Sequence, residues 1–228
     1  MSKEADGGRK GRIKTRVKTA RGRKISSTRW LQRQLNDPYV EKAQKEGYRS
    51  RAAYKLTEMD DRFGFLKPGY RVVDLGCAPG GWLQVAVERT KALTGQGFVF
   101  GIDLLDIEPV QGSTFVKMDF LDDTAPQLIT DMAGAELDTV LSDMAANVTG
   151  HRKTDHLRTI ALAEAAAWFA FESLKPGGSF CAKVFQGGTT GELLEGLKKN
   201  FTRVVHMKPK ASRKESVELY VIATGFRG

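Results

Sequence analysis

The stretch from Tyr70 to Trp82 constrains the fold of this chain more than any other. It is an apolar run ending in Asp74 and Leu75, followed by three glycines and a proline, and then by the helical pattern of residues 82–89. This order predicts a β-strand, a tight turn and a helix. Glycines there let a ligand approach the backbone, and the free N–H groups of the helix face the same point. An ordinary strand-to-helix turn remains the alternative.

The spacing of the glycines separates two classes of cofactor. A dinucleotide site requires Gly-x-Gly-x-x-Gly, whereas this chain has Gly76, Gly80 and Gly81, with Asp74 before them. That pattern resembles motif I of the S-adenosylmethionine-dependent methyltransferases. The resemblance implies a methyl donor rather than NAD.

Short apolar runs alternate with helical patterns along the chain, which is typical of a parallel sheet covered by helices on both faces. The expected strands cover residues 70–75, 98–102, 114–117, 138–141, 179–185, 202–206 and 217–224. The expected helices cover residues 39–47, 51–63, 82–89, 121–132, 154 or 155 to 174, and 189 or 190 to 200, after a first helix that starts at residue 30. Asp37-Pro38 is expected to interrupt that first helix, and Ser50 to cap the helix over 51–63. The predicted fold class is α/β, a Rossmann-like methyltransferase fold with a mostly parallel seven-stranded sheet.

Acidic residues lie near the ends of four expected strands: Asp74, Asp103, Asp119 and Asp143. Ligands of open α/β sheets bind outside the carboxyl ends of the strands. Asp103 is placed to accept hydrogen bonds from ribose hydroxyls. Asp119 is expected to accept one from an adenine amino group, an assignment that rests on the resemblance as much as on its position. Any one of them could instead cap a helix or a turn, but four in register favour a ligand site. Trp82, beside the glycine turn, is expected either to contact the donor or to pack in the core.

Positive charge is concentrated at the N-terminus. Residues 1–34 hold 12 of the 36 Lys and Arg and 2 of the 27 acids, a net of +10, so the rest of the chain carries −1 of the total +9. A second basic cluster lies in residues 198–214. Separated basic segments of this kind bind polyanions, which predicts a nucleic-acid partner; a solvated tail is the alternative for the first of them. We expect residues 1–26 to form a basic disordered arm and residues 27–228 the methyltransferase domain.

Composition excludes several other classes of protein. Cys77 and Cys181 form neither a disulfide framework nor a Cys-x-x-Cys metal site, so we expect a reducing compartment and no metal. No apolar run approaches the length of a membrane span. A cytoplasmic monomer without membrane contact is expected. The alternative is a mitochondrial presequence in the basic N-terminus, against which Glu4 and Asp6 count.

The absence of two known motifs narrows the choice of methyl acceptor. Enzymes that methylate base amino groups usually carry a [DNS]-P-P-[YFW] loop after the fourth strand, where this chain reads Ser-Asp-Met-Ala-Ala-Asn over residues 142–147. Methylation at cytosine C5 requires a cysteine nucleophile. Cys77 lies in the glycine turn, and Cys181 lacks the Pro-Cys or Thr-Cys setting of those enzymes. Lysines and acids remain as the reactive groups at this edge of the sheet.

Five segments resemble the motifs of the FtsJ-type (RrmJ/RlmE) ribosomal RNA 2′-O-methyltransferases, in the same order. They are residues 49–56, 74–82, 142–145, 183–187 and 216–220. The resemblance implies a catalytic tetrad of Lys55, Asp143, Lys183 and Glu218. It also implies donor-binding positions at Gly80, Trp82, Asp103, Asp119 and Asp143. We prefer Glu218 to Glu215 because it directly precedes an apolar-Tyr-apolar strand. Ala146 stands where the family commonly has proline, which removes a rigid φ but no reacting group.

The tetrad suits the deprotonation of a ribose hydroxyl, which is a very weak acid. Taken alone, Lys55 is expected to be a charged residue on the protein surface. Lys183 lies within an apolar strand, where a charged group requires a partner or a task. Burial and the charge of Lys55 favour the neutral amine of Lys183, and the two carboxylates oppose this. We expect Lys183 to be the general base.

The resemblance also implies the acceptor, a uridine ribose in the A loop of 23S rRNA within the 50S subunit. Segments 1–34 and 198–214 are then expected to contact RNA phosphates. The 2′-hydroxyl exists only in RNA, which agrees with this. Two alternatives remain: a 2′-O-methyltransferase of tRNA or mitochondrial rRNA, and a ribosome-assembly factor without catalysis.

Overall fold

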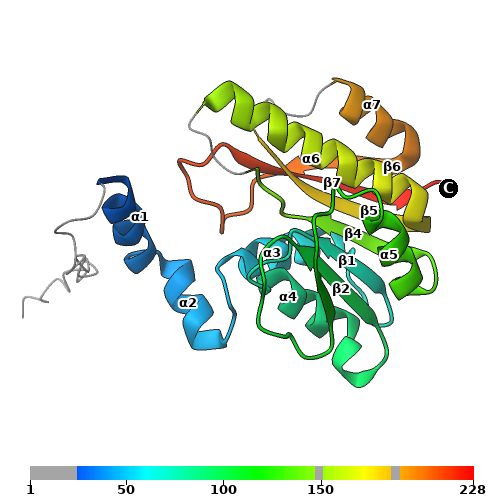
Figure 1. Ribbon diagram of the computed structural model, residues 1–228, viewed down its shortest axis with the longest axis horizontal. Coiled ribbons are helices and arrows are strands. Elements are labelled where there is room, and N and C mark those ends of the chain that lie inside the picture. Colours follow the sequence, from blue (N-terminus) through cyan, green and yellow to red (C-terminus); the bar gives the residue numbers. More distant parts are fainter. Residues whose placement is uncertain (1–24, 147–150, 186–190) are drawn as a thin grey trace, which may run out of the picture.

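The computed structural model describes residues 25–146, 151–185 and 191–228. Within these residues, seven strands form one sheet (Figure 1). The strands are β1 (Arg71–Leu75), β2 (Phe98–Asp103), β3 (Thr114–Lys117), β4 (Leu137–Ser142), β5 (Leu174–Phe185), β6 (Phe201–Met207) and β7 (Glu218–Phe226). The helices are α1 (Ile25–Leu35), α2 (Pro38–Glu46), α3 (Ala52–Phe63), α4 (Gly81–Thr90), the short 3₁₀ helix η1 (Ala92–Thr94), α5 (Ala125–Ala133), α6 (Arg152–Ser173) and α7 (Gly191–Asn200).

The sheet is mostly parallel, with the strand order β3-β2-β1-β4-β5-β7-β6. Strands β1 to β5 run parallel to one another, whereas β7 lies antiparallel between β5 and β6. This confirms the predicted fold class. The strand order reverses between β1 and β4, and such a switch point opens a crevice at the carboxyl ends of the strands.

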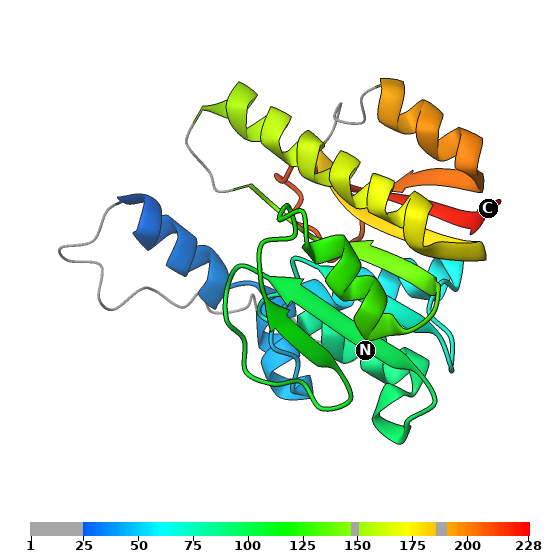
Figure 2. The ribbon, with the colours of Figure 1, turned by 45° about the vertical axis from the view of Figure 1, so that its right-hand side comes forward.

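Alternate residues of each strand enter one of two hydrophobic cores, because successive side chains of a strand point to opposite faces. Val73 and Phe180 belong to the core under α5, α6 and α7. Val72 and Cys181 belong to the core under α3 and α4. Figures 1 and 2 show these two groups of helices on opposite sides of the sheet. The face under α3 and α4 also receives Tyr220, and it becomes the side of the sheet on which the candidate site is built.

The N-terminal helices α1 and α2 extend away from the sheet (Figure 1). Asp37 caps α2, since its carboxylate accepts the N–H of Tyr39 at 3.0 Å, so the predicted interruption at Asp37-Pro38 is confirmed. Helix α1 begins at Ile25, so the predicted arm of residues 1–26 lies outside the described residues except for its last two positions.

The predicted cap of α3 is wrong. Arg51, not Ser50, occupies the cap position, and no side chain caps this helix. The hydroxyl of Ser50 has no hydrogen-bond partner among the described residues. It lies against the glycine turn instead, where a Cβ on Gly81 would be 2.4 Å from Ser50 Oγ. Tertiary packing therefore takes Ser50 away from the local role that its residue type favours.

Other helix starts also differ from the predictions. Helix α5 begins at Ala125 rather than at residue 121, because Asp119 and Asp122 accept the N–H groups of Leu121 and Thr124 and hold that stretch as turns. Helix α6 begins at Arg152, before the predicted Thr154 or Asp155. The predicted start of α7 at residue 189 or 190 lies outside the described residues.

Strand β5 begins five residues earlier than predicted, at Leu174. Leu174 pairs with Leu137, and the register then shifts so that Ser179 pairs with Thr139. The Pro-Gly-Gly at 176–178 therefore lies in an irregular part of the strand, where Gly177 takes a φ of 84°.

None of the helices in the described ranges is long and apolar enough to cross a membrane.

Candidate active site

Four ionisable side chains from distant segments meet at the carboxyl end of β5. Lys55 Nζ lies 2.6 Å from Glu218 Oε1, and Lys183 Nζ lies 3.1 Å from Asp143 Oδ1. All four side chains are mostly buried, with exposed fractions between 9% and 19%. Charges held this far from solvent interact more strongly than the same pairs at the surface. The structure thus brings together the four residues of the predicted tetrad.

The register of the sheet explains this convergence. β5 and β7 pair so that Lys183 lies opposite Tyr220, and Glu218 is two residues away on the same face. Asp143 directly follows β4, which is the other neighbour of β5. Lys55 reaches the group from α3, which packs on that face. The expectation that Lys55 lies on the surface is therefore wrong, because the chain places it over a buried carboxylate.

Tyr220 joins the two ion pairs. Its hydroxyl lies 2.8 Å from Asp143 Oδ1 and 3.2 Å from Glu218 Oε1, and it accepts a hydrogen bond from Lys55 Nζ at 3.0 Å. The ring is completely buried. Reasoning from the sequence did not identify this residue as part of the site. In the sequence, Tyr220 stands between apolar residues of the strand after Glu218, and this pattern predicts only a core residue.

The surroundings set the charge states at this centre. Burial raises the pKa of Asp143, but the ammonium groups of Lys183 and Lys55 and the hydrogen bond from Tyr220 outweigh it, so that its pKa lies below the ordinary value. Burial, and then the carboxylates of Asp143 and Glu218, hold the pKa of Tyr220 well above its ordinary value. Asp143 is therefore an anion at neutral pH, and the Tyr220 hydroxyl keeps the single proton that it donates.

Further contacts fix the orientation of the tetrad. Lys183 Nζ also donates to the backbone carbonyl of Asp143 at 2.5 Å, so two acceptors on one residue hold the amine. The buried hydroxyl of Ser212 donates to Glu218 Oε1 at 2.9 Å. Glu215 is exposed, as expected from its position outside the strand.

A cavity of about 390 Å³ opens next to Asp143, above the carboxyl ends of β1, β2 and β4. It is lined by Gly76, Ala78, Ile102, Asp103, Leu104, Leu105, Met118, Asp119, Phe120, Asp143, Met144, Ala145 and Leu162. Its volume lies within the range of small-molecule sites, about 300–1,000 Å³. We call it the donor cavity.

The residues of the donor cavity fit a ligand with an adenosine group. Asp103 accepts the N–H groups of Ala78 and Leu105 at 2.8 Å each, which orients its carboxylate at the mouth of the glycine turn. Asp119 Oδ1 accepts the N–H of Leu121 at 2.9 Å. Carboxylates placed here can accept from hydroxyl and amino groups. A Cβ on Gly76 would lie 2.6 Å from Cγ of Met144, so only glycine lets this turn approach the segment after β4.

Asp74 lies fully buried at the end of β1, and neither of its carboxylate oxygens has a hydrogen-bond partner among the described residues. Burial, followed by the charges of Asp143 and Asp103, holds its pKa well above the ordinary value. Asp74 therefore keeps its proton to a higher pH than an exposed aspartate does. In the described part of the chain, no group of three His, Cys, Asp or Glu side chains is placed to hold a metal ion.

Two predicted donor-binding residues lie outside the lining of the donor cavity. Gly80 precedes α4 with a φ of 103°, and a Cβ there would meet Arg49 and Val110. Trp82 is 3% exposed, donates its indole N–H to the carbonyl of Ala52 at 2.8 Å and packs 5.7 Å from the ring of Tyr220. This geometry favours the packing role of Trp82, and donor contact by either residue stays a prediction.

A second cavity, of about 440 Å³, adjoins the other ion pair of the tetrad, and Lys55 and Glu218 are in its wall. We call it the basic cavity because Arg33, Arg51 and Arg213 also line it. Arg51 and Arg213 flank the carboxylate of Asp37.

Three polar atoms of residues that line the basic cavity have no hydrogen-bond partner among the described residues. The buried atoms Arg51 Nε, Arg213 Nη2 and Ser50 Oγ make no hydrogen bond within the described residues. All three residues line this cavity, and buried donors without partners are rare in folded proteins. The charge of the wall points to the kind of ligand: Arg33, Arg51, Lys55 and Arg213 outnumber Glu215 and Glu218, so the cavity suits an anionic ligand.

Comparisons with known proteins identify the family of this chain. Residues 48–226 match the family model described as FtsJ-like methyltransferase. Three similar relatives are each called Ribosomal RNA large subunit methyltransferase E. The protein from Roseobacter denitrificans is 59% identical over 94% of this chain and 92% of its own length. Those from Cereibacter sphaeroides and Ruegeria pomeroyi are 57% and 56% identical over the whole chain, and over 95% and 100% of their own lengths.

A solved structure is also similar. A protein from Plasmodium falciparum described as a ribosomal RNA methyltransferase superposes with a TM-score of 0.70 at 32% sequence identity. The match covers 79% of this chain and 100% of that one.

Proposed function

The chain belongs to the FtsJ-like methyltransferase family, and we propose that it methylates the 2′-oxygen of a uridine ribose in the A loop of 23S ribosomal RNA. One observation carries this proposal. The tetrad and Tyr220 lie between two cavities and contribute walls to both, Asp143 to the donor cavity and Lys55 and Glu218 to the basic cavity. The names of the relatives support ribosomal RNA as the substrate.

The methyl donor is S-adenosylmethionine, which supplies a methyl group already activated on a sulfonium. Asp103 is proposed to hold the ribose hydroxyls and Asp119 the adenine amino group. Gly80 and Trp82, beside the glycine turn, are proposed as further donor-binding positions on the resemblance to the family. Asp143, at the inner end of the same cavity, is proposed to border the reacting methyl group.

Lys183 is the proposed general base. An RNA ribose that enters from the basic cavity brings its 2′-hydroxyl to the tetrad. The 2′-oxygen would form its bond to the methyl carbon as the methyl–sulfur bond breaks and S-adenosylhomocysteine leaves. The 2′-proton would pass to Nζ of Lys183, which has to be in its neutral amine form to accept it. Asp143 holds that amine through two acceptors and stabilises the ammonium group that results. Lys55 and Glu218 orient the acceptor through the other half of the centre, and Tyr220 keeps both halves in one geometry.

The basic cavity and the basic segments are proposed to hold RNA phosphates. Three arginines and Lys55 line the cavity, against two glutamates, and arginine and lysine side chains are the usual partners of RNA phosphates. We propose that segments 1–34 and 198–214 also contact RNA phosphates; Arg213, in the second of them, lines the basic cavity. Within the second segment, Lys208 is already engaged, because its Nζ donates to the carbonyls of Lys214 and Ser216. We further propose a basic arm over residues 1–26, a methyltransferase domain over 27–228, and a cytoplasmic monomer.

One assay tests the proposal. The protein is incubated with tritiated S-adenosylmethionine and with 50S particles, naked 23S rRNA or tRNA, all taken from cells that lack the enzyme. We expect label in the 50S particle, at one A-loop ribose whose phosphodiester bond becomes resistant to alkaline hydrolysis. Label in tRNA alone, on a base, or in no RNA would overturn it. Lys183→Met, assayed beside the wild type, separates enzymatic label from a contaminating activity.

A further inference from the structure

Arg49 joins two loops from outside the donor cavity. Its Nη1 donates to the carbonyl of Pro79 at 3.4 Å and to that of Glu108, and its Nη2 donates to the carbonyl of Pro109 at 2.7 Å. Pro79 belongs to the glycine turn, residues 76–80. Glu108 and Pro109 belong to the connection between β2 and β3, residues 104–113. One guanidinium therefore spans three backbone carbonyls, which its rigid fork of five donors makes possible.

The same two loops are joined a second time from inside the cavity. Asp103 accepts the N–H of Ala78, in the glycine turn, and that of Leu105, in the connection. Arg49 thus provides donors to carbonyls on the outer side, and Asp103 provides acceptors to N–H groups on the inner side. Ala78, Leu104 and Leu105, which belong to the two joined loops, line the donor cavity. Leu104 and Leu105 are 58% and 67% exposed, so packing alone holds them weakly.

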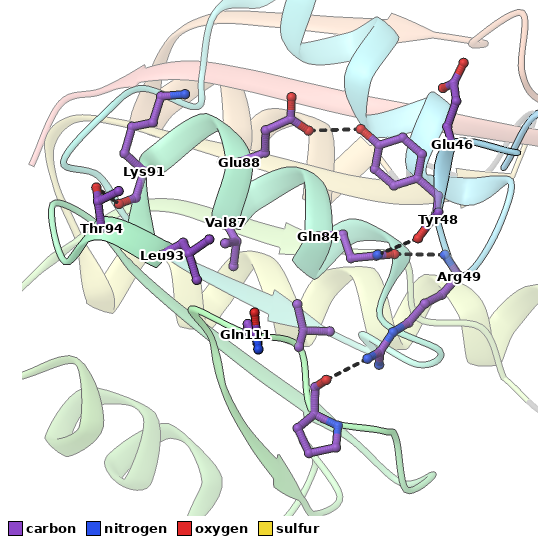
Figure 3. Close-up of a pocket in the computed structure, with 13 residues that line it drawn as sticks. Glu46, Tyr48, Arg49, Gln84, Val87, Glu88, Lys91, Leu93, Thr94 and Gln111 are labelled. Atoms are coloured by element: carbon purple, nitrogen blue, oxygen red, sulfur yellow. Dashed lines mark hydrogen bonds between the residues drawn. The ribbon is translucent and has the colours of Figure 1, made fainter. Parts of the chain in front are cut away.

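Arg49 is itself held in place (Figure 3). Gln84 of α4 accepts the backbone N–H of Arg49 at 2.8 Å and donates to the carbonyl of Gly47 at 2.9 Å. The Arg49 side chain lies against Gly80, where an added Cβ would be 3.0 Å from Nη1 and 3.2 Å from Cδ. Arg49 and Pro109 both line a cavity of about 660 Å³, and Figure 3 shows the Arg49 guanidinium hydrogen-bonded to a backbone carbonyl in its wall. These contacts hold both the backbone and the side chain of Arg49 in one orientation.

We propose that Arg49 is a positioning residue for the methyl-donor site: by joining the glycine turn to the β2–β3 connection, it sets the width of the donor cavity without touching the donor. The inference rests on the proposed function, because it takes that cavity to be the S-adenosylmethionine site. Loss of the joint frees residues 104–112 and widens the cavity. Donor affinity falls, since ordering this connection then opposes binding. Chemistry on donor that is already bound is little affected.

The test compares Arg49→Met, Arg49→Lys and a matched control, Arg227→Met. Arg227 is exposed and also donates to a backbone carbonyl, that of Lys199, but it lies after β7, away from the donor cavity. Calorimetric titration with S-adenosylhomocysteine, without RNA, measures affinity. We expect the Kd to rise about tenfold or more in Arg49→Met and less in Arg49→Lys, because lysine carries the charge but cannot span both loops. Arg227→Met should bind like the wild type.

Steady-state kinetics then locate the effect. In Arg49→Met, the KM for S-adenosylmethionine should rise while kcat at saturating donor and the KM for 50S particles stay within about twofold of the wild type. An unchanged Kd for S-adenosylhomocysteine in both Arg49 variants would overturn the inference. A raised KM for particles with an unchanged donor KM would also overturn it, because Arg49 would then contact RNA.

Amide hydrogen exchange on the protein without ligands separates this inference from the proposed function. Residues 105–112 should exchange faster in Arg49→Met than in Arg227→Met, whether or not the wild type binds the donor. Equal exchange rates would mean that Arg49 does not hold the glycine turn and the β2–β3 connection together. If the wild type failed to bind S-adenosylhomocysteine while the exchange difference was present, the proposed function would fail and the joint would stand. If Arg49→Met does not fold, Arg49→Lys replaces it in each of these comparisons with Arg227→Met.

Discussion

The hydroxyl of Tyr220 lies 2.8 Å from Oδ1 of Asp143, the same oxygen that pairs with Lys183 at 3.1 Å. One carboxylate oxygen thus receives both a neutral and a charged donor. The same hydroxyl accepts from Lys55. Because both lysines are tied to it, directly or through Asp143, the tyrosine connects the two ion pairs into one network.

Tyr220→Phe should separate those pairs without disturbing the core. The ring stays in place, and only the oxygen that contacts Lys55, Asp143 and Glu218 is removed. We expect kcat to fall about tenfold or more and unfolding free energy to fall by about 1–3 kcal/mol, because charged partners lose a buried hydrogen bond. Single-turnover methylation and urea unfolding measure the two effects. A wild-type kcat would show that the hydroxyl is dispensable for catalysis.

Lys183→Met should slow methyl transfer strongly while leaving donor binding near the wild-type value. We expect the single-turnover rate to fall by about 10²–10⁴, the range that general bases contribute. Lys175→Met is the matched control. It breaks a lysine–aspartate contact of 2.5 Å to Asp138, near the opposite end of the same strand. Equal rates for the two variants would remove Lys183 from the mechanism. Titration with S-adenosylhomocysteine checks that the donor cavity is intact.

Asp119→Ala should weaken donor binding. Its carboxylate lines the donor cavity, whereas Asp122, three residues later, supports a similar turn outside the lining. We expect the Kd for S-adenosylhomocysteine to rise about tenfold in Asp119→Ala, which corresponds to about 1.4 kcal/mol. Asp122→Ala should remain within about twofold of the wild type. If both variants lose affinity equally, the effect comes from the turn and not from a ligand contact.

Asp74→Asn should change how stability depends on pH. The raised pKa of Asp74 means that, above about pH 4, the unfolded chain releases a proton that the native protein retains. Wild-type stability therefore decreases as pH rises from about 4 toward the native pKa, with a slope of at most about 1.4 kcal/mol per pH unit from this group. Asparagine cannot titrate, so the variant lacks this loss.

The difference in unfolding free energy, variant minus wild type, should thus increase between pH 5 and pH 7. Urea unfolding without donor measures it at each pH, with the exposed Glu136→Gln as a control. A difference that does not change with pH would mean that Asp74 is ionised in the native protein.

Deletion of residues 1–24 should weaken RNA binding without changing donor affinity. This segment carries ten Lys and Arg against two acids, and helix α1 begins directly after it. The logarithm of the association constant for 50S particles should fall less steeply with the logarithm of salt concentration. The slope should decrease by about 0.7–0.9 for each phosphate that the segment neutralises in the full-length protein. Equal slopes for the two proteins would show that the segment does not bind RNA.

The sequence alone determined the class of the fold and the edge of the sheet at which ligands bind. Strand and helix periodicities, the glycine turn after Asp74 and the acids at the strand ends are local signals, because each depends only on neighbouring residues. The resemblance to a known family then indicated the four tetrad residues. Local reasoning failed where packing overrode it, as at Ser50, whose hydroxyl lies against Gly81 instead of capping α3.

Only the tertiary structure decided how the site is assembled. The role of Tyr220 depends on the antiparallel register that sets it opposite Lys183, and the burial of Lys55 depends on which face of the sheet α3 covers. Arg49 joins two loops that lie 30 and 59 positions further along the chain. The physical reason is that a hydrogen bond between distant residues follows from strand register and layer packing, which no short window of sequence contains.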